Sequence, residues 1–417
     1  DRIGPRLSGS DGHAAAIVWT QEEFRRDGLD RVRAEKVMVP HWVRGEERAE
    51  IVAPVALRLT ATALGGSEPT PPDGVTAEVV EVDSLEALAA RGDAVRGKIV
   101  LFNRQTVRDR EGAGYVATSP LRHKGPSEAA RRGAVATMVR SLGTLRARLP
   151  HTGSLSYTDD APRIPAAAIT EEDADLLHRL LEAGGPVRVR LTLGCRNLPD
   201  VESANVVAEL RGRAKPDEVV LIGAHLDSWD LGQGSIDDGA GVAIVMEAMR
   251  LLRRLDLLPD RTVRAVLYAN EENGLRGGKG YVEAHRDELP RHVAAVESDS
   301  GGAAPIGLRV VLAPGDEERL RRLATSMAPL GAGEVSAREG GGADIGPLKP
   351  FGVPLIGLRQ DMTGYFDWHH SAGDTLDKVD PATLAANAAA MAYLAWALAR
   401  LDPPLARLPP EAAPAAH

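Results

Sequence analysis

The feature that most constrains the fold is a regular alternation of apolar, strand-like runs with helical runs after about residue 205. Four apolar runs stand out in this part of the chain: EVVLIGA at 218–224, TVRAVLYAN at 262–270, HVAAVES at 292–298 and VPLIGLR at 353–359. Strands that alternate with helices pair in parallel, because a parallel pair needs a crossover connection and that connection is usually a helix. The sequence therefore predicts an α/β fold, with a doubly wound, mainly parallel sheet and helices on both faces.

The length of 417 residues favours two compact units or one unit with a large insertion. Changes in the pattern of apolar, Pro and Gly residues along the chain mark the boundaries between them. The Pro- and Gly-rich stretch GGSEPTPPDG marks the first boundary. We expect the N-terminal part of the main domain at 1–70, an inserted domain at 71–195, the rest of the main domain at 196–402 and a frayed Pro/Ala-rich tail at 403–417.

Periodicity predicts the elements within these parts. The segment AAAIVWTQEEFRRDGL has helical spacing, and RVRAEKVMVP after it is strand-like. In the expected insertion, GKIVLF and VRVRLTL are strand-like, whereas PSEAARRGAVATMV and EEDADLLHRLLEAGG have a helical pattern. The insertion is thus predicted to be a smaller, β-rich α/β unit that could fold on its own core.

Composition excludes several classes of function. The chain has 50 basic and 59 acidic residues, and no cluster of Lys and Arg interleaved with aromatic residues, which argues against nucleic acid as a partner. No uninterrupted apolar run approaches the roughly 20 residues that span a bilayer, so we expect no membrane span. Cys195 is the single cysteine, which excludes an internal disulfide and a cysteine-based zinc site. The start at Asp1 is what a mature chain shows after an export signal is removed, and it favours a secreted or periplasmic protein.

Acids and histidines follow the predicted strands at the points where the strands end. In an open parallel sheet, ligands bind beyond the carboxyl ends of the strands, so these positions are the ones to inspect. They hold His225 and Asp227, then Glu271 and Glu272, then Asp299, and after the last strand and a loop His369 and His370. Each position alone has an ordinary interpretation as a solvated strand end or a packed histidine.

Asp237 and Asp238 stand where GQGSIDDG leads into the helical run GAGVAIVMEAMRLL. The apolar stripe of that run, formed by Val242, Val245, Met246, Met249 and Leu252, predicts an amphipathic helix. An aspartate at a helix start is favoured as an N-cap and by the helix dipole, so capping is the simpler interpretation of either residue taken alone.

Taken together, these positions favour a metal site. Carboxylates that converge on one sheet edge repel one another unless cations neutralise them. Histidine and carboxylate side chains supply the nitrogen and oxygen donors that zinc accepts. Competing signatures are missing: the sequence has no GxSxG, HExxH or GxGxxG, and GLRGGK at 274–279 is one residue short of a P-loop. A metal-activated water is the leading attacking group.

The motifs HLDSWDLGQGSIDDG, NEENG, ESDSG and HHSAGDT, in this order, resemble the co-catalytic zinc exopeptidases of the aminopeptidase and glutamate carboxypeptidase type, and most closely their carboxypeptidase Q branch. The resemblance covers residues 200–400, and PRLSGSDG near the N-terminus is similar to the family's opening segment. VRGKIVLFNR, AARRGAVATMV and IPAAAIT make the inserted domain resemble a protease-associated domain, with a role over the catalytic face or a purely structural role.

The resemblance implies two zinc ions per chain, with cobalt or manganese as substitutes. It makes Asp237 the carboxylate that bridges both ions, and each ion keeps an open place for a shared water or hydroxide. The remaining implied ligands are His225 and Asp299 for one ion, and Glu272 and His370 for the other. The family also has a cis peptide between the two adjacent aspartates, here Asp237 and Asp238.

The same resemblance assigns the catalytic roles. It makes Glu271 the general base and Asp227 the acid that orients His225. Many aminopeptidases of the family have a tyrosine where this chain has His369, so this histidine is either an oxyanion donor or a packing residue beside the ligand.

The sequence thus predicts a zinc-dependent exopeptidase for dipeptides or short peptides with a free terminus. An aminopeptidase for longer peptides is the alternative within the enzymes, and a single-zinc glutaminyl cyclase is disfavoured by the full ligand set. A receptor-like ectodomain without activity is the alternative outside the enzymes. By analogy with the carboxypeptidase Q branch, we expect a homodimer.

Overall fold

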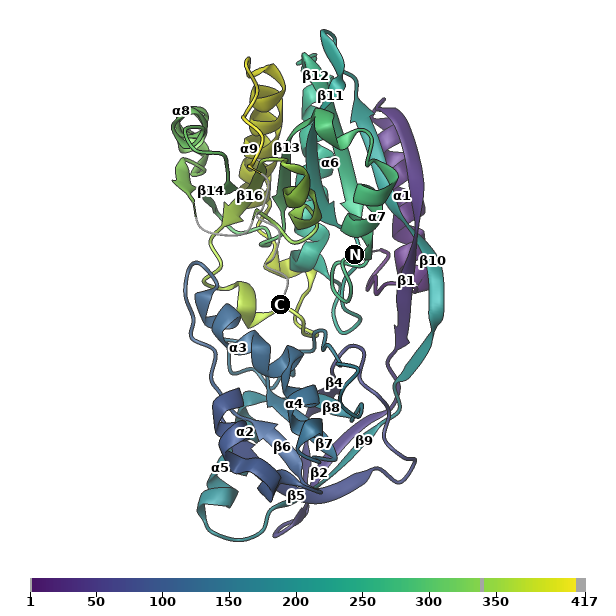
Figure 1. The fold of residues 1–417 in the computed structure, drawn as a ribbon, viewed down its shortest axis with the longest axis vertical. Helices are drawn as coiled ribbons and strands as arrows, with labels where there is room; N and C mark the ends of the chain where they lie inside the picture. The colour runs from purple at the N-terminus through teal and green to yellow at the C-terminus, as the bar shows by residue number, and fades with distance from the viewer. Residues whose placement is uncertain (1, 338–340, 410–417) are drawn as a thin grey trace. The chain divides into compact units, whose positions relative to one another are not determined.

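The computed structural model describes residues 2–337 and 341–409, and these form two compact units (Figure 1). The first unit holds the chain up to Val39, then Val201–Asp361, and the chain from Thr375 onward. The second unit holds Pro40–Asp200 and Met362–Asp374. Residues 40–70, which the sequence placed in the main domain, belong to the second unit because β2 (Glu47–Ala53) pairs with β9 (Arg188–Leu193) there.

The first unit is built on an eight-stranded sheet, and its central strands are parallel. The strand order is β1-β10-β12-β11-β13-β16-β14-β15. β11 pairs in parallel with β12 and β13, and β13 with β16, whereas β10 and β14 join antiparallel to β12 and β16. The strands are β1 (Asp30–Val43), β10 (Arg196–Leu210), β11 (Lys215–His225), β12 (Arg261–Tyr268), β13 (His292–Ser298), β14 (Pro305–Val311), β15 (Glu334–Ser336) and β16 (Leu355–Gln360).

Helices cover both faces of this sheet, as predicted. On one face, α1 (Asp11–Arg26), α6 (Ala240–Arg254), α8 (Glu317–Met327) and α9 (Pro381–Arg400) share a core with strand residues such as Ile222 (Figure 1). On the other face, α7 (Arg276–Ala284) and the short helices at Leu289–Arg291 and Gly346–Phe351 pack against residues such as Leu221. Neighbouring strand residues therefore point to opposite cores. The predicted apolar stripe of α6 is buried throughout.

The helix α9 is long and apolar enough to cross a membrane by length and composition alone. It therefore corrects the expectation that no stretch of the chain approaches this limit. Its side chains from Ala388 to Ala399 are largely buried among those of α6 and the sheet, and 56% of its most apolar window is buried in the fold. This burial is typical of a core helix.

The second unit contains its own eight-stranded sheet and its own core (Figure 1). The strand order is β3-β2-β9-β5-β6-β7-β8-β4. The remaining strands are β3 (Leu57–Leu59), β4 (Ala61–Ala63), β5 (Val75–Val82), β6 (Ile99–Phe102), β7 (Ala136–Arg140) and β8 (Ala166–Ile169). The helices are α2 (Leu85–Arg91), α3 (Ala113–His123), α4 (Gly125–Arg131) and α5 (Glu171–Glu182). The described chain also has short 3-10 or π turns at Gly92–Val95, Ser235–Gly239, Ala328–Leu330, Tyr365–Asp367 and Leu376–Lys378.

Two local predictions are wrong. The run PSEAARRGAVATMV is not one helix: α4 ends at Arg131, Gly133 takes a φ of +83°, and β7 follows as a strand between β6 and β8. The expected frayed tail is packed in its first part, where Leu405 and Leu408 are buried and the Leu408 N–H donates to the Gly352 carbonyl at 2.8 Å. Residues 410–417 of this tail lie outside the described residues.

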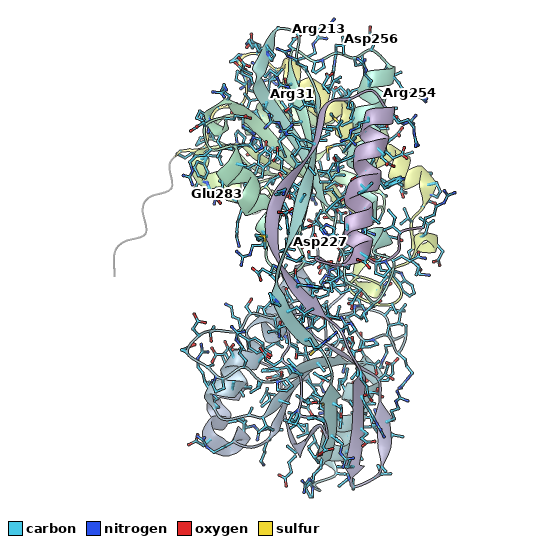
Figure 2. The ribbon with its side chains drawn as sticks, turned by 90° about the vertical axis from the view of Figure 1, so that its right-hand side faces the viewer. Arg31, Arg213, Asp227, Arg254, Asp256 and Glu283 are labelled. Atoms are coloured by element: carbon cyan, nitrogen blue, oxygen red, sulfur yellow. The ribbon has the colours of Figure 1, made fainter. Side chains whose placement is uncertain are left out.

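The carboxyl ends of the parallel strands define one edge of the first unit. β11 runs from Lys215 to His225, and Asp227 follows at this edge. Figure 2 shows Asp227 at the opposite end of the sheet from Arg213, which precedes β11, and from Asp256, which follows α6. The predicted candidate residues of this unit thus gather where an α/β sheet binds its ligands.

Asp237 and Asp238, in the turn before α6, have different contacts. The predicted cis peptide between Asp237 and Asp238 is present. The Asp238 carboxylate is fully buried and accepts hydrogen bonds from the Gly241 N–H at 2.9 Å and from the His225 N–H at 3.2 Å. The N-cap of α6 is Gly239, so neither aspartate occupies the cap position, but the Asp238 side chain ties the start of α6 to the end of β11.

This tie leaves no room for a side chain at Gly241. A Cβ atom there would lie 2.3 Å from the Asp238 carboxylate oxygens and 2.3 Å from the carbonyl oxygen of Ser298. We expect Gly241→Ala to destabilise the protein by about 1–3 kcal/mol, since overpacking forces the backbone to shift. Thermal unfolding should show this loss. Gly346→Ala, which would meet no atom within 4 Å, is the matched control and should unfold as the wild type does.

Candidate metal centre

Three potential metal ligands converge at the edge of the first unit. They are His225 at the end of β11, Asp237 in the turn before α6 and Asp299 just after β13. The Nε2 atom of His225 lies 3.2 Å from a carboxylate oxygen of Asp237 and 3.4 Å from one of Asp299. All three ligand atoms lie within 4.8 Å of one another. The sequence had assigned these three residues to one zinc ion.

Hydrogen bonding fixes which nitrogen of His225 faces the cluster. Its Nδ1 atom lies 3.0 Å from the carbonyl oxygen of Asp227, which can only accept, so Nδ1 carries the proton and Nε2 faces the two carboxylates. Burial lowers the pKa of His225, but hydrogen bonds to Asp237 and Asp299 outweigh it and raise the pKa well above its usual value. The cluster therefore attracts positive charge strongly.

Asp227 connects this cluster to the next strand. Its carboxylate is fully buried and accepts from the Glu271 N–H at 3.0 Å and from the Ser8 hydroxyl at 3.1 Å. The nearest carboxylate oxygen of Asp227 lies 3.9 Å from Nδ1 of His225, whereas the backbone carbonyl oxygen of Asp227 lies 3.0 Å from the same nitrogen. Asp227 thus orients His225 chiefly through its main chain and uses its side chain to hold Glu271.

Sequence reasoning missed the contribution of the N-terminal segment. The Arg6 guanidinium donates to the carbonyl oxygens of Leu226 at 2.7 Å and of Gln233 and Gly234 at 2.9 Å each. Arg6 and Ser8 therefore stabilise the loop that contains Asp227 through hydrogen bonds. Both residues belong to the segment PRLSGSDG, which resembles the family's opening segment. That resemblance gave no role to Arg6 or Ser8.

Glu271 and Glu272 follow β12, after Asn270 with its φ of +65°. Loss of water around its carboxyl group raises the pKa of Glu271 well above the usual value, and neighbouring carboxylates add to the shift against the opposing charge of His225. A raised pKa suits a carboxylate that has to take up a proton. Glu272, the implied ligand of the second ion, is buried but is not a member of the three-residue cluster.

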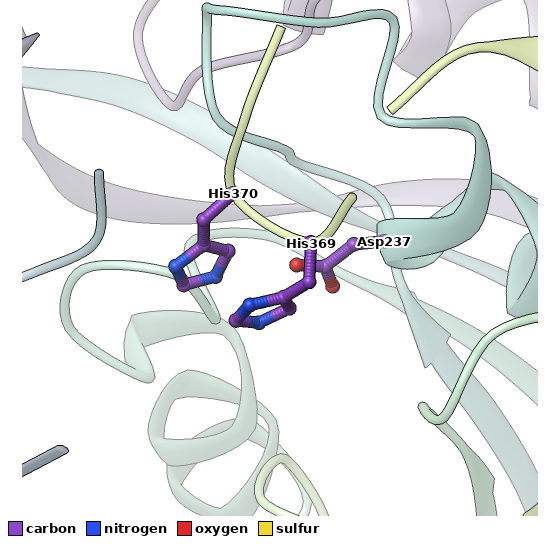
Figure 3. Close-up of side chains that lie close together, drawn as sticks. All are labelled: Asp237, His369 and His370. Carbon is purple, nitrogen blue, oxygen red and sulfur yellow. The ribbon is translucent and has the colours of Figure 1, made fainter. Parts of the chain in front are cut away.

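His369 and His370 belong to the second unit, where their rings stack with centroids 3.5 Å apart and planes 19° apart (Figure 3). His370 has a φ of +60°, and its Nδ1 lies 3.3 Å from the carbonyl oxygen of Thr152. As in His225, a backbone carbonyl can thus hold the Nδ1 proton and leave Nε2 as a donor atom for a metal. The His369 ring contacts Tyr115, Tyr365 and Phe366, with centroids 5.0 to 5.2 Å apart.

A cavity of about 310 Å³ borders the cluster within the first unit. Its lining includes Asp299 and two arginines, Arg309 and Arg359. Gly341 and Gly342 also line it. Glu297 lines it as well, and Arg359 lies 3.7 Å from Glu334, so the cavity combines two carboxylates with two guanidinium groups, which can bind a carboxylate in a bidentate geometry.

The cluster fits a zinc ion. Zinc in catalytic sites takes three protein ligands of the nitrogen and oxygen type and keeps one position open. His225, Asp237 and Asp299 supply one nitrogen and two carboxylates, and a cation among them would relieve the repulsion between the acids.

Comparison with known proteins agrees with this chemistry. The model of peptidase family M28 matches residues 205–395. Carboxypeptidase Q of Mus musculus is 39% identical over 402 residues, which cover 96% of this chain and 84% of the mouse protein, and human carboxypeptidase Q is 38% identical over the same length.

Solved structures support the same relationship. A peptidase M28 precursor from Shewanella amazonensis superposes with a TM-score of 0.95 at 43% identity, covering 98% of this chain and 93% of the other. A zinc aminopeptidase from Bacillus subtilis shares the fold, with a TM-score of 0.70 at 21% identity over 94% of this chain and 91% of the other. The chain therefore belongs to peptidase family M28 and is a zinc metallopeptidase, a hydrolase of peptide bonds.

Proposed function

We propose that the chain hydrolyses dipeptides and other short peptides with a free terminus, using two zinc ions. The observation that carries this proposal is the convergence of His225, Asp237 and Asp299 at the edge of the sheet. The similarity to carboxypeptidase Q over nearly the whole chain supports it as well.

In this proposal, Asp237, His225 and Asp299 would hold the first ion. Asp237 would also contribute to the second ion, together with Glu272 and His370. The geometry of the first unit supports the first set directly. For the second set, the support is the motif order, the burial of Glu272 and the orientation of the His370 ring by the Thr152 carbonyl.

Zinc, when bound, polarises the scissile carbonyl and lowers the pKa of a water molecule. The side chains then divide the proton transfers. Glu271 takes a proton from the attacking water and passes it to the nitrogen of the leaving amine, for which its raised pKa is suited. Asp227 holds the Glu271 backbone in place. We propose His369 as the donor to the carbonyl oxygen, with packing beside His370 as the alternative role.

The cavity beside Asp299 favours substrates that carry a carboxylate close to the scissile bond. Arg309 and Arg359 line this cavity, and a dipeptide presents its free carboxylate within a short reach of its single peptide bond. An aminopeptidase that acts on longer peptides is the second candidate, because relatives named as aminopeptidases share the fold.

We further propose that the second unit acts as a protease-associated domain, which the segments VRGKIVLFNR and IPAAAIT favour. Export from the cytoplasm is supported by the similarity to a protein named as a precursor. A homodimer without a membrane span is the expected state, by analogy with the carboxypeptidase Q branch.

The role of Glu271 is testable with one substitution. Glu271→Gln keeps the size of the side chain but cannot take up the proton, so kcat should fall by about 100- to 10,000-fold. Metal content, measured by mass spectrometry on protein purified without chelators, should stay at two zinc ions per chain. Glu283→Gln, on the exposed side of α7, is the matched control and should keep full activity. A Glu271→Gln variant with wild-type turnover would refute the assignment.

The substrate class is testable by comparing a dipeptide with its tripeptide extension and with its amide. If the cavity binds the free carboxylate, a dipeptide should have a higher kcat/KM than the tripeptide that extends it at the carboxyl end. Amidation of the dipeptide should raise KM, since the arginines lose their anionic partner. Equal rates for dipeptide, tripeptide and amide would favour the aminopeptidase for longer peptides.

A further inference from the structure

Arg122 is a buried arginine to which the proposed mechanism gives no role. It is the penultimate residue of α3, in the second unit, and it is 3% exposed. In the described part of the chain its guanidinium pairs with no carboxylate, and its hydrogen-bond partners are the carbonyl oxygens of Thr152 and Ser154 and the Nε2 atom of His123. A buried charge without an acid partner is costly, so this position calls for an explanation.

Arg122 holds a short stretch of backbone, the three residues from Thr152 to Ser154, which we call the 152–154 segment. Its Nε atom donates to the carbonyl oxygen of Ser154 at 3.2 Å, and its Nη1 atom donates to that of Thr152 at 3.4 Å. The Thr152 hydroxyl also donates to the carbonyl oxygen of Ala63, the last residue of β4, at 2.8 Å. The 152–154 segment is therefore fixed between α3 and the sheet of the second unit.

The same segment binds His370 through both of its backbone groups at Thr152. The Thr152 N–H donates to the carbonyl oxygen of His370 at 2.8 Å, and Nδ1 of His370 lies 3.3 Å from the Thr152 carbonyl oxygen. This pairing holds a residue whose φ of +60° is uncommon outside glycine. A carbonyl oxygen has two lone pairs, so that of Thr152 accepts from Arg122 and from the His370 ring at once.

Gly153 allows the guanidinium and the imidazole to approach the segment together. A Cβ atom at Gly153 would lie 2.4 Å from Cζ of Arg122 and 2.7 Å from Nδ1 of His370. Its φ of +132° is also a conformation that residues with a side chain rarely adopt. Both groups therefore occupy the space beside Gly153 that any larger residue would need for its own side chain.

Tyr115 gives Arg122 a second route to the segment that carries the two histidines, Met362–Asp374. The guanidinium lies over the Tyr115 ring, 5.5 Å from its centroid. That ring stacks on Phe366, with centroids 4.4 Å apart, and meets the His369 ring edge to face at 5.0 Å. Arg122 thus supports both the backbone that binds His370 and an aromatic side chain that packs beside it.

We propose that Arg122 is a positioning residue of the metal centre: it fixes the 152–154 segment, so that Thr152 holds the proton on Nδ1 of His370 and Nε2 is the atom presented to the second zinc ion. This proposal rests on the proposed function, in which His370 is a ligand of that ion. Hydrogen bonds that orient a ligating histidine in this way contribute to metal affinity. Arg122 acts through His370, and the second unit thereby takes part in metal binding.

Metal affinity tests this role without activity. In Arg122→Met, which loses the charge and every donor, the Kd of one zinc ion should rise by about 10- to 100-fold while the other ion binds as in wild type. Zinc titration of metal-free protein against a competing chelator measures both values. Arg122→Lys keeps the charge and should recover part of the loss, and Arg179→Met, exposed on α5 of the same unit, is the matched control. Wild-type affinities in Arg122→Met, or an equal weakening of both ions, would overturn the proposal.

A second variant tests the contact while Arg122 and its charge stay in place. In Gly153→Ala the added methyl group should displace the guanidinium and the His370 ring, so the same zinc ion should bind more weakly, again by about 10-fold or more. Gly185→Ala, which would meet no atom within 4 Å, is the matched control in the same unit and should keep both affinities. If Gly153→Ala also keeps both affinities, these contacts do not govern His370 and the proposal is wrong.

The tautomer of His370 in metal-free protein separates this proposal from the proposed function. Nitrogen-15 NMR of histidine-labelled protein at about pH 8, where an ordinary histidine is neutral, should show the proton on Nδ1 in wild type and a share moved to Nε2 in Arg122→Met. His370→Gln identifies the signal. An unchanged tautomer would contradict the positioning role. If wild type binds a single zinc ion, the two-ion function fails, and the tautomer alone then decides whether Arg122 positions His370.

Discussion

The repulsion among carboxylates at one edge of a sheet is the constraint on which this structure depends. Asp237 and Asp299 lie beside the imidazole of His225, and the carboxyl groups of Glu271, Asp227 and Asp238 belong to the same edge of the sheet. Burial raises the pKa of Asp238 well above its usual value, with the charges of Asp299 and Asp237 adding to the shift against the opposing charge of His225. Such an arrangement costs free energy in the folded state, and dications among the acids would offset that cost.

The fold is organised to keep these acids together. The parallel strands β11, β12 and β13 deliver them to the same edge, and the apolar cores on both faces of the sheet hold the strands in register. Around the edge, neutral groups fix Asp238, Asp227 and Glu297 by directed hydrogen bonds: the backbone N–H groups of Gly241 and Glu271, the Ser8 hydroxyl and the three amides that bind Glu297. These three acids are thus oriented before any metal or substrate arrives.

The elements that carry the site could be predicted from the sequence because their signals are local. Apolar runs of strand length, the stripe of α6 and the short distances between motifs such as NEENG and ESDSG are read within a few residues of each position. The cis peptide at Asp237 followed from the family pattern and is present, and His225, Asp237 and Asp299 lie together, while their role as ligands stays a prediction.

Features that depend on distant parts of the chain could not be predicted. The second unit includes residues 40–70 because β2 pairs with β9, more than a hundred residues later, and β7 is a strand because it completes a sheet between β6 and β8. The Glu297 carboxylate accepts hydrogen bonds from backbone N–H groups of Ala343 and Ile345, which lie 46 and 48 residues later in the chain. The position of Glu297, two residues before Asp299, does not indicate in the sequence that its side chain binds this distant backbone.

We infer that a pair of dications compensates the acids around Asp237. Anomalous diffraction at the zinc edge, on crystals of protein purified without chelators, would locate these ions. We expect two peaks, each at about 2.0–2.2 Å from an oxygen of the Asp237 carboxylate, as is usual for zinc bound to carboxylates. A single peak at Asp237, or none, in a fully active sample would show that two dications do not compensate these acids.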